Sequence, residues 1–490
     1  MSTHRFTLRA IAPALLRAAL VAAGLGLGWP ISAATPPAAN IILILTDDQG
    51  WTSVSRPMDR DRPDARSDFY RTPSMDRLAD RGMRFPHAYA AAPVCSPTRY
   101  SLLFAKTPAR LGKTLVRGPN RVDHSQLSLP QMLKRVDPAY LCAHFGKWHI
   151  DVDPAEVGYD ESDGKTSGRD GGFRYGAPDW KGRPAEDPKL IDHVTSRGIG
   201  FLRERAADGK PFYLQLSHYA VHSDILYRAE TYAETQGRAP GSVHRHAGFA
   251  AMLEDLDAGV GRLARAYDEL GLAGNTYLFF TSDNGGVPLI PPRAVYGKPL
   301  RTPGMNAPLR RGKWDLTEGG IRVPLFVVGP GVDPGSQCDT PVASYDFAPT
   351  CVELAGADEP MPDGVDGGSF APLLRGASGV PIDRPLGDAL VFHMPHYNNF
   401  GLSEPHSAIR RGRHKLLHFY DSDRSLLFDL AADIGERNDL SRQEPELTER
   451  LRGELLAYLA TVGAEQPADS VTAKLRRADG TGAPFVEQFE

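Results

Sequence analysis

Short apolar runs, each followed by polar residues at its carboxyl end, recur along this chain of 490 residues. Residues 41–45 lead into Asp47-Asp48, and residues 277–281 lead into Asp283-Asn284. The other apolar runs span residues 140–143, 212–216 and 324–328. A short continuous apolar run is typical of a strand that is buried on both faces of a sheet.

Helical segments separate these strands. Ser74 can cap a helix that runs to Arg81 and is closed by Gly82, and residues 246–270 keep helical apolar spacing up to Gly271. Strands that alternate with helices predict an α/β fold with a large, mostly parallel mixed sheet sandwiched by helices. Ligands of such sheets bind outside the carboxyl ends of the strands, where the polar residues lie.

Loops and a second domain complete the predicted organisation. Residues 151–200 and 286–312 are rich in Gly, Pro and charge, and we expect long loops over the site there. Glycines at 376 and 379 suggest a boundary between a catalytic domain, 35–380, and a C-terminal α+β subdomain, 381–490. For the latter we predict a small antiparallel sheet from residues 390–394, 408–411, 415–420 and 426–430, with a hairpin turn at 421–423 and a helix at 445–462.

The N-terminal residues have the order of a secretory signal peptide. Arg5 and Arg9 precede a mostly apolar stretch, 11–29, and small residues follow at 32–34. We therefore predict a signal peptide over 1–34 and an exported protein, periplasmic or secreted; a membrane-anchoring helix is the alternative, which Arg17 disfavours. No later segment approaches the roughly 20 apolar residues that span a bilayer, so stable membrane insertion is not expected.

Composition narrows the class of protein. A hydrophobic fraction of 41% and a charged fraction of 24% are ordinary for a globular chain. The net charge of −4 provides no basic footprint for nucleic acid. Export implies an oxidising compartment, but the four cysteines are too few for a disulfide scaffold. We expect at most one pair, Cys338 with Cys351.

The residues at the strand ends are candidate metal ligands. Asp47, Asp48, Asp283 and Asn284 provide three carboxylates and an amide, hard oxygen ligands that suit calcium or magnesium rather than zinc. For either pair taken alone, turn formation or helix capping by Asp is an equally good interpretation. Two such pairs at matching strand ends favour metal binding over turn formation or helix capping.

A cysteine and several cations could face such a metal. Pro97 suits the first turn of a helix, which places Cys95 at the helix N-terminus, where anions are favoured, with Arg99 one turn later. The alternative is a buried cysteine before an ordinary helix. Four more candidates are Lys147, His149, His222 and Lys313. Singly they can be surface lysines and core histidines; together with Arg99 they could form a cationic cup for a sulfate or phosphate ester.

Five blocks, in order, resemble a type I sulfatase of the arylsulfatase A-like family, in the alkaline phosphatase superfamily. They are Ile44-Leu45-Thr46-Asp47-Asp48-Gln49-Gly50-Trp51, Pro93-Val94-Cys95-Ser96-Pro97-Thr98-Arg99, Gly146-Lys147-Trp148-His149, Ser282-Asp283-Asn284-Gly285-Gly286, and Gly312-Lys313 with Glu318-Gly319-Gly320-Ile321-Arg322-Val323-Pro324. The resemblance spans about residues 40–440, including the small C-terminal domain, and implies an alkaline phosphatase-like fold.

The resemblance also implies chemistry. A separate formylglycine-generating maturation enzyme would convert Cys95 to formylglycine, whose hydrated form, bound to Ca²⁺, attacks the sulfur of a sulfate monoester. Cys95 would join Asp47, Asp48, Asp283 and Asn284 as a calcium ligand. Arg99 and His149 would hold and deprotonate the hydrated aldehyde. Lys147, His222 and Lys313 would contact the sulfate and the leaving group.

Two departures from the family pattern bear on maturation and substrate. Leu103-Phe104-Ala105-Lys106 replaces the usual Leu-Thr-Gly and a basic residue, which bears on how Cys95 is recognised for oxidation. Arg310-Arg311-Gly312-Lys313 replaces Arg-Gly-Gly-Lys, which adds a positive charge.

The substrate preferred from the sequence is a sulfated carbohydrate, with a simple aryl sulfate or a phosphate or phosphonate ester as alternatives. The expected partner is therefore a sulfated small molecule or glycan. A catalytically silent protein that binds a sulfated glycan is a further alternative, if Cys95 is never oxidised. Candidate substrate-binding residues are Arg310, Arg311, His393 and His396, although a hydrogen-bonded structural role fits each histidine equally well.

Overall fold

The structure, a computed structural model, describes residues 38–116, 120–166, 186–290, 300–301, 305–357, 360–397 and 404–469. All of these residues belong to one compact unit, Pro37–Glu490. The predicted signal peptide, 1–34, lies outside the described residues. Residues 167–185, the centre of the first predicted loop, lie outside them too.

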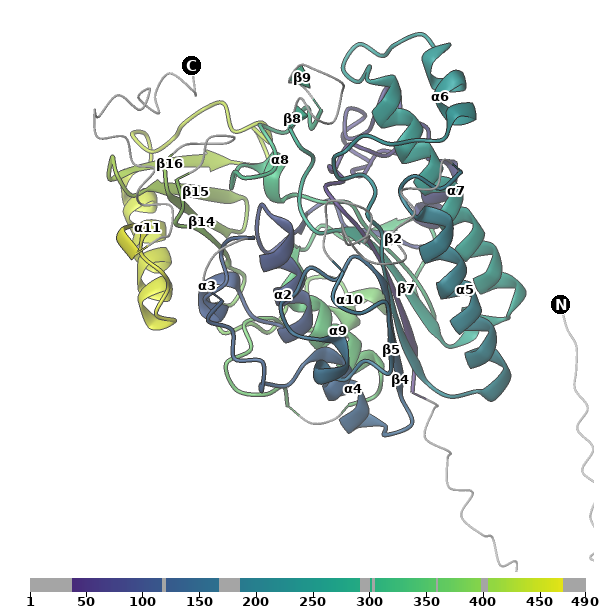
Figure 1. The fold of residues 1–490 in the computed structure, drawn as a ribbon. Helices are drawn as coiled ribbons and strands as arrows, with labels where there is room; N and C mark the ends of the chain where they lie inside the picture. Colours follow the sequence, from purple (N-terminus) through teal and green to yellow (C-terminus); the bar gives the residue numbers. More distant parts are fainter. Residues whose placement is uncertain are drawn as a thin grey trace, which may run out of the picture. The chain divides into compact units, whose positions relative to one another are not determined.

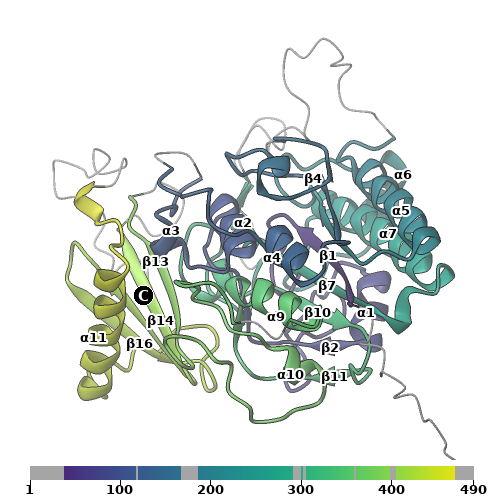
Figure 2. The same ribbon diagram turned by 90° about the horizontal axis from the view of Figure 1, so that it is seen from below.

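A mixed sheet of eight strands, in the order β11-β2-β10-β7-β1-β6-β4-β5, forms the centre of the described structure (Figures 1 and 2). Neighbouring strands from β7 to β5 run parallel, whereas β10 is antiparallel to both β7 and β2. The strands are β1 (Asn40–Thr46), β2 (Met83–Arg84), β4 (Leu141–Gly146), β5 (Glu161–Ser162), β6 (Phe212–Ser217), β7 (Thr276–Ser282), β10 (Leu325–Val328) and β11 (Ser336–Gln337). Two two-stranded sheets pair β12 (Val342–Ala343) with β3 (Ala88–Tyr89) and β8 (Leu289–Ile290) with β9 (Leu300–Arg301).

Helices cover both faces of this sheet. Alternate residues of a strand point to opposite faces, so each central strand contributes to a core on either side. Ile42 and Ile44 of β1 pack in one core with residues of α1, α5 and α7, and Ile41 and Leu43 pack in another with residues of α2, α4, α9 and α10. Figure 1 shows α5 and α7 on one side of the sheet and α2, α4 and α9 on the other. The helices are α1 (Pro73–Arg81), α2 (Cys95–Phe104), α3 (Pro108–Leu111), α4 (Leu129–Val136), α5 (Ile191–Asp208), α6 (Ala229–Gln236), α7 (Ala247–Glu269), α8 (Glu318–Ile321), α9 (Phe347–Leu354) and α10 (Ala371–Leu374).

The C-terminal residues form the antiparallel sheet and helix that the sequence predicts. The strands are β13 (Leu390–Met394), β14 (His406–Arg411), β15 (His414–Phe419) and β16 (Arg424–Asp429), paired in chain order, and α11 (Pro445–Thr461) follows. One face of this sheet packs on Leu451 and Leu455 of α11. The other face packs on Tyr89, Leu316 and Ile321, so a continuous core joins it to the residues around α8. The boundary between domains near residue 380 stays a prediction.

Two local predictions need correction. Residues 151–200 are not one loop, because α5 begins at Ile191 and residues 154–157 form a short 3-10 turn. Helix α1 begins at Pro73, and Ser74 does not cap it. Instead the Asp257 carboxylate on α7 accepts hydrogen bonds from the backbone N–H groups of Ser74 and Met75, at 2.9 and 2.8 Å.

The expected disulfide is also wrong. Cys338 and Cys351 are both free. Cys351 is buried on α9 in the core beneath the main sheet, whereas the half-buried Cys338 follows the edge strand β11. Within the described ranges, no helix combines the length and the apolar character that crossing a bilayer requires.

Candidate active site

The two acidic strand ends meet because β1 and β7 are parallel neighbours in register. Thr46 is paired with Ser282, so the residues that follow each strand leave the same edge of the sheet side by side. The backbone N–H of Asp283 donates to the Thr46 carbonyl oxygen at 3.1 Å. The backbone N–H of Asp48 donates to Asp283 Oδ1 at 3.2 Å. The convergence predicted from the sequence is therefore confirmed.

Side-chain cations face these carboxylates. Lys147 Nζ binds Asp47 Oδ2, and both side chains are fully buried. Lys313 Nζ donates to Asp48 Oδ1 at 2.6 Å, and Asn284 Nδ2 donates to the same oxygen at 2.7 Å. The lysines come from different parts of the chain: Lys147 follows β4, and Lys313 precedes α8.

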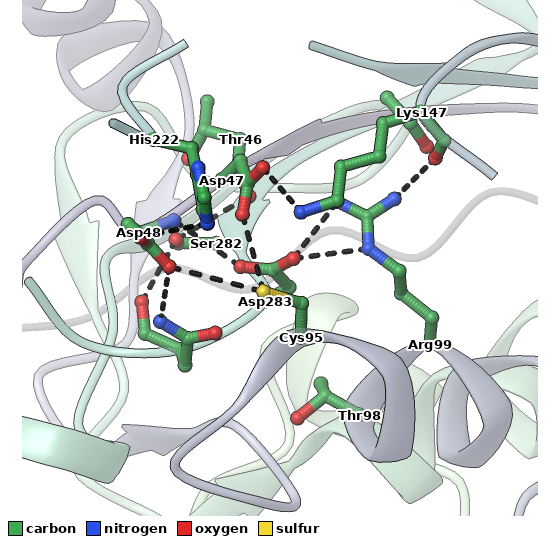
Figure 3. Close-up of polar contacts among 12 residues, drawn as sticks. Thr46, Asp47, Asp48, Cys95, Thr98, Arg99, Lys147, His222, Ser282 and Asp283 are labelled. Carbon is green, nitrogen blue, oxygen red and sulfur yellow. Dashed lines mark hydrogen bonds and ion pairs between the residues drawn. The ribbon is translucent and has the colours of Figure 1, made fainter. Parts of the chain in front are cut away.

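Cys95 lies at the centre of this cluster, at the N-terminus of α2, as Figure 3 shows. Its Sγ is 3.5 Å from Asp47 Oδ1 and 3.9 Å from Asp48 Oδ1, and Lys313 Nζ is 3.3 Å from Sγ. Val94, the residue before the helix, provides no side-chain cap for the first N–H groups of α2. An anion bound beside Cys95 would be stabilised by that helix end.

Arg99, one turn into α2, links the helix that begins at Cys95 to the carboxylate of Asp283. Its Nε and Nη2 donate to Asp283 Oδ2 at 3.0 and 2.8 Å (Figure 3). Its Nη1 donates to the carbonyl oxygen of Lys147. The Arg99 and Asp283 side chains are both buried, so this pair fixes the helix against the end of β7.

The two histidines predicted for the site lie at its margin. His222 Nε2 is 3.6 Å from Asp48 Oδ2, and its Nδ1 is 2.6 Å from the carbonyl oxygen of Ser223. Because that carbonyl only accepts, Nδ1 carries the proton and Nε2 is the atom that faces the site. His149 has a left-handed backbone, φ 57°, so the chain from Lys147 to His149 is not a continuous extended segment. Burial, and then the charges of Lys147 and Arg99, hold the pKa of His149 well below its usual value.

The electrostatics of the cluster follow from its burial. Burial, and then the charge of Asp283, raise the pKa of the Cys95 thiol to about 12 against the opposing effect of Lys147 and Lys313. Burial, and then the negative charge of Asp47, raise the pKa of Asp283 to about 6. Burial opposes ionisation of Asp47 as well, but Lys147 and His222 outweigh it and hold the Asp47 pKa well below its usual value. The cysteine is thus a neutral thiol at neutral pH.

The donor set fits a divalent cation. Ligand atoms of Asp47, Asp48, Cys95 and His222 all lie within 4.8 Å of one another. Two buried oxygens, Asp48 Oδ2 and Asn284 Oδ1, accept no hydrogen bond. Buried polar atoms without partners are costly, and oxygen ligands of this kind suit a hard cation. Three carboxylates face three side-chain cations, Arg99, Lys147 and Lys313, so a divalent ion would give the site an excess of positive charge.

Comparison with known proteins decides the family. The profile of a family described as Sulfatase matches residues 39–357, and that of the N-sulphoglucosamine sulphohydrolase C-terminal region matches residues 312–461. The chain belongs to the sulfatase family. It is therefore a sulfuric ester hydrolase, and its chemistry is the hydrolysis of sulfate esters; the family implies a metal and formylglycine.

Relatives of this sulfatase include an N-acetylgalactosamine-6-sulfatase, an enzyme named only as a sulfatase, and an arylsulfatase. It is 30% identical to the N-acetylgalactosamine-6-sulfatase of Sus scrofa, over 75% of this chain and 70% of the relative. It is 29% identical to a sulfatase of Formosa agariphila, over 86% of this chain and 88% of the relative, and 29% identical to human arylsulfatase A, over 85% of each.

Solved structures share the sulfatase fold. The structure of Ps i-CgsB in complex with k-i-k-neocarrahexaose has a TM-score of 0.71 at 24% identity, covering 92% of this chain and 100% of the other. The structure of BT4656 in complex with its substrate D-glucosamine-2-N,6-O-disulfate has a TM-score of 0.66 at 20% identity, covering 88% and 100%.

The four candidate substrate-binding residues of this sulfatase have protein partners. Arg310 Nη1 donates to the Glu436 carbonyl oxygen at 2.6 Å, and Arg311 Nε donates to Asp315 Oδ2 at 2.5 Å. His393 is buried, with Nδ1 2.6 Å from Ser407 Oγ and Nε2 2.8 Å from the Glu465 carbonyl oxygen. His396 Nε2 is 2.8 Å from Thr114 Oγ1. Their assignment to substrate stays a prediction.

Sequence reasoning missed the residues that hold the Lys313 segment. The backbone N–H of Lys313 donates to the Gly286 carbonyl oxygen, and that of Trp314 donates to the Pro93 carbonyl oxygen, two residues before Cys95. Further along, His406 Nε2 accepts from the Leu316 N–H at 3.1 Å, and Glu436 Oε2 accepts from the Glu318 N–H at 2.7 Å. Glu318 lies in one of the five family blocks, but no local pattern marks His406, the partner of Leu316, or Glu436, the partner of Glu318.

Proposed function

We propose that this sulfatase removes sulfate monoesters from a carbohydrate, with formylglycine derived from Cys95 as its nucleophile and Ca²⁺ as its metal. The carbohydrate preference is supported by the relative named N-acetylgalactosamine-6-sulfatase and by the saccharides bound in the related structures. The alternative, a simple aryl sulfate, is supported by the similarity to arylsulfatase A.

The observation that carries the proposal is the position of Cys95. Its sulfur touches Asp47, Asp48 and Lys313 at once, at the start of a helix. A side-chain oxygen at this position would face both a cation held by the carboxylates and an anion held by the lysine. Formylglycine, hydrated, supplies such an oxygen nucleophile and a second hydroxyl through which the product sulfate is released.

Five residues of this chain would hold the metal: Asp47, Asp48, Asp283, Asn284 and the modified residue 95. Calcium supplies Lewis acidity that activates the nucleophile and neutralises the sulfate oxygens. Oxygens of Asp48 and Asn284 that accept no hydrogen bond support this assignment, since they are available as ligands.

The cations around Cys95 have separate proposed tasks. Arg99 is braced by Asp283 and the Lys147 carbonyl, so it holds residue 95 and the end of β7 in a fixed relation. His149 accepts the proton of the nucleophile. Lys147 and Lys313 bind the sulfate oxygens, and His222 contacts the leaving group, whose released alcohol can donate its O–H to Nε2. Such fixed charges stabilise developing negative charge without reorganisation.

Export is part of the proposal and is supported by the basic, apolar and small-residue order of residues 1–34. It places the enzyme in the periplasm or outside the cell, where polymeric sulfated glycans that do not enter cells are accessible. N-terminal sequencing of the exported protein should begin near residue 35, and a mature chain that retains residues 1–34 would contradict cleavage.

The proposed nucleophile is tested on protein from the native host. Mass spectrometry of the Cys95 peptide should show that sulfur is replaced by an aldehyde, and the protein should release sulfate from N-acetylgalactosamine 6-sulfate. Cys95→Ala should abolish release, whereas Cys142→Ala, at a buried cysteine of β4, should retain it. An unmodified thiol without sulfate release refutes the mechanism; release from 4-nitrophenyl sulfate alone refutes the carbohydrate preference.

A further inference from the structure

We propose that Trp314 is a substrate-binding residue of this enzyme, whose indole ring is a platform for the sugar ring that carries the sulfate. The inference deepens the proposed function and rests on it, because it assigns the carbohydrate part of the substrate to a place beside the sulfate-binding lysine. Nothing in the sequence pattern singled out Trp314.

The indole ring of Trp314 lies beside the Lys313 ammonium. Lys313 Nζ lies over the Trp314 ring, 5.7 Å from its centroid. The same Nζ is 3.3 Å from Cys95 Sγ and 2.6 Å from Asp48 Oδ1. The ring and the nucleophilic position therefore both lie close to a single ammonium group. A sulfate that this ammonium holds has its ester oxygen, and thus its sugar, within reach of the ring.

The backbone at Trp314 is specialised for this arrangement. Its φ is 79°, in the left-handed region that a bulky residue rarely adopts. Its N–H donates to the Pro93 carbonyl oxygen at 2.9 Å, and the next N–H, of Asp315, donates to the Gly312 carbonyl oxygen at 3.1 Å. In an extended chain, successive side chains would point to opposite sides. The left-handed turn instead keeps the Trp314 ring next to the Lys313 ammonium, and strained backbone of this kind clusters at functional sites.

The exposure of Trp314 separates it from the structural tryptophans. Trp51 and Trp148 are buried in the two cores of the main sheet, whereas Trp314 is only half-buried. A partly exposed tryptophan beside a charged catalytic cluster offers an apolar surface in a polar site. Sugars match this combination, since the C–H face of the ring packs on an aromatic face while the hydroxyl groups reach polar side chains.

Binding measurements on a protein that cannot turn over test the platform directly. In a Cys95→Ala background, calorimetry would compare N-acetylgalactosamine 6-sulfate with inorganic sulfate, each with Trp314, with Trp314→Ala and with Trp314→Phe. Loss of the ring should weaken binding of the ester about tenfold, as expected for an aromatic contact of about 1.4 kcal/mol. Binding of inorganic sulfate should change less than about twofold, because Lys313 remains braced by Asp48. Phe should restore most of the affinity for the ester.

The outcomes separate the platform from a structural role. Equal weakening of ester and sulfate binding would mean that Trp314 only supports Lys313, and unchanged ester binding would mean that the sugar lies elsewhere; either result overturns the inference. Turnover by matured enzyme separates it from the proposed function. Sulfate release with a KM that Trp314→Ala leaves unaltered refutes the platform alone. Ring-dependent binding of the ester without any sulfate release refutes the proposed reaction alone.

Discussion

The buried ion network behind the Lys313 segment predicts a large stability cost when Lys415 is replaced by Met. Lys415 Nζ, on β15, is 2.8 Å from Glu318 Oε1 and 2.8 Å from Glu436 Oε1, and all three side chains are fully buried. The second oxygen of Glu318 is held by Arg322 at 2.6 Å. Lys415→Met therefore leaves two buried carboxylates sharing one remaining close cation.

The magnitude follows from the loss of one partner from a buried ion pair, which costs about 3–5 kcal/mol. Burial and then Glu318 act to raise the pKa of Glu436, against the effect of Lys415. In the variant, Glu436 loses that opposing effect and takes up a proton more readily in the folded state. Protonation relieves part of the buried charge, so the loss of folding free energy is expected near the lower end of that range, about 3 kcal/mol. That is a large part of a typical folding free energy of about 5–15 kcal/mol. Since the folded variant then binds more protons than the unfolded chain, its stability should rise as the pH falls.

Urea unfolding, followed by fluorescence and circular dichroism at pH 5.5 and pH 8, provides the measurement. Lys134→Met is the matched control, since Lys134 forms a half-exposed pair with Asp160 at 2.7 Å and should lose no more than about 1 kcal/mol. A cost for Lys415→Met that equals that of Lys134→Met, or that grows as the pH falls, would refute the reasoning.

Three further predictions concern the site and the fold. Lys313→Met should lower kcat/KM for sulfate release by about 100- to 1000-fold, as for loss of one oxyanion donor, with an unchanged circular dichroism spectrum; a loss below about threefold contradicts its role. Chelation by EGTA should stop sulfate release, and added Ca²⁺ should restore it and raise the unfolding temperature with concentration, whereas a Tm that does not respond to Ca²⁺ argues against the site. Burial raises the pKa of Asp257 to about 6. The folded state therefore binds an extra proton between about pH 4 and 6, and it loses stability as the pH rises through that window. The stability of wild type relative to Asp257→Asn should be greatest near pH 4, and a difference that instead grows toward about pH 7 would contradict this.

Local pattern determined most of the elements of this protein. The apolar runs became β1, β4, β6, β7 and β10, and the C-terminal strands and helix lie where short-range alternation and turn residues place them. Pattern failed where local preference and tertiary environment diverged. Helix α5 begins inside a stretch rich in Gly and charge, and α1 takes its cap from Asp257, 183 residues away.

The sequence by itself also determined the inventory of the site, because parallel strands deliver their carboxyl-end residues to one edge. Asp47, Asp48, Asp283 and Asn284 converge for that reason, and Cys95 begins its helix as Pro97 indicates. Only the tertiary structure decided how the cations are held. The segment after Lys313 is fixed by His406 and Glu436 from beyond the main sheet, and Trp314 has a left-handed backbone. Contacts between residues distant in the chain depend on how whole layers pack, and neither periodicity nor spacing carries that information.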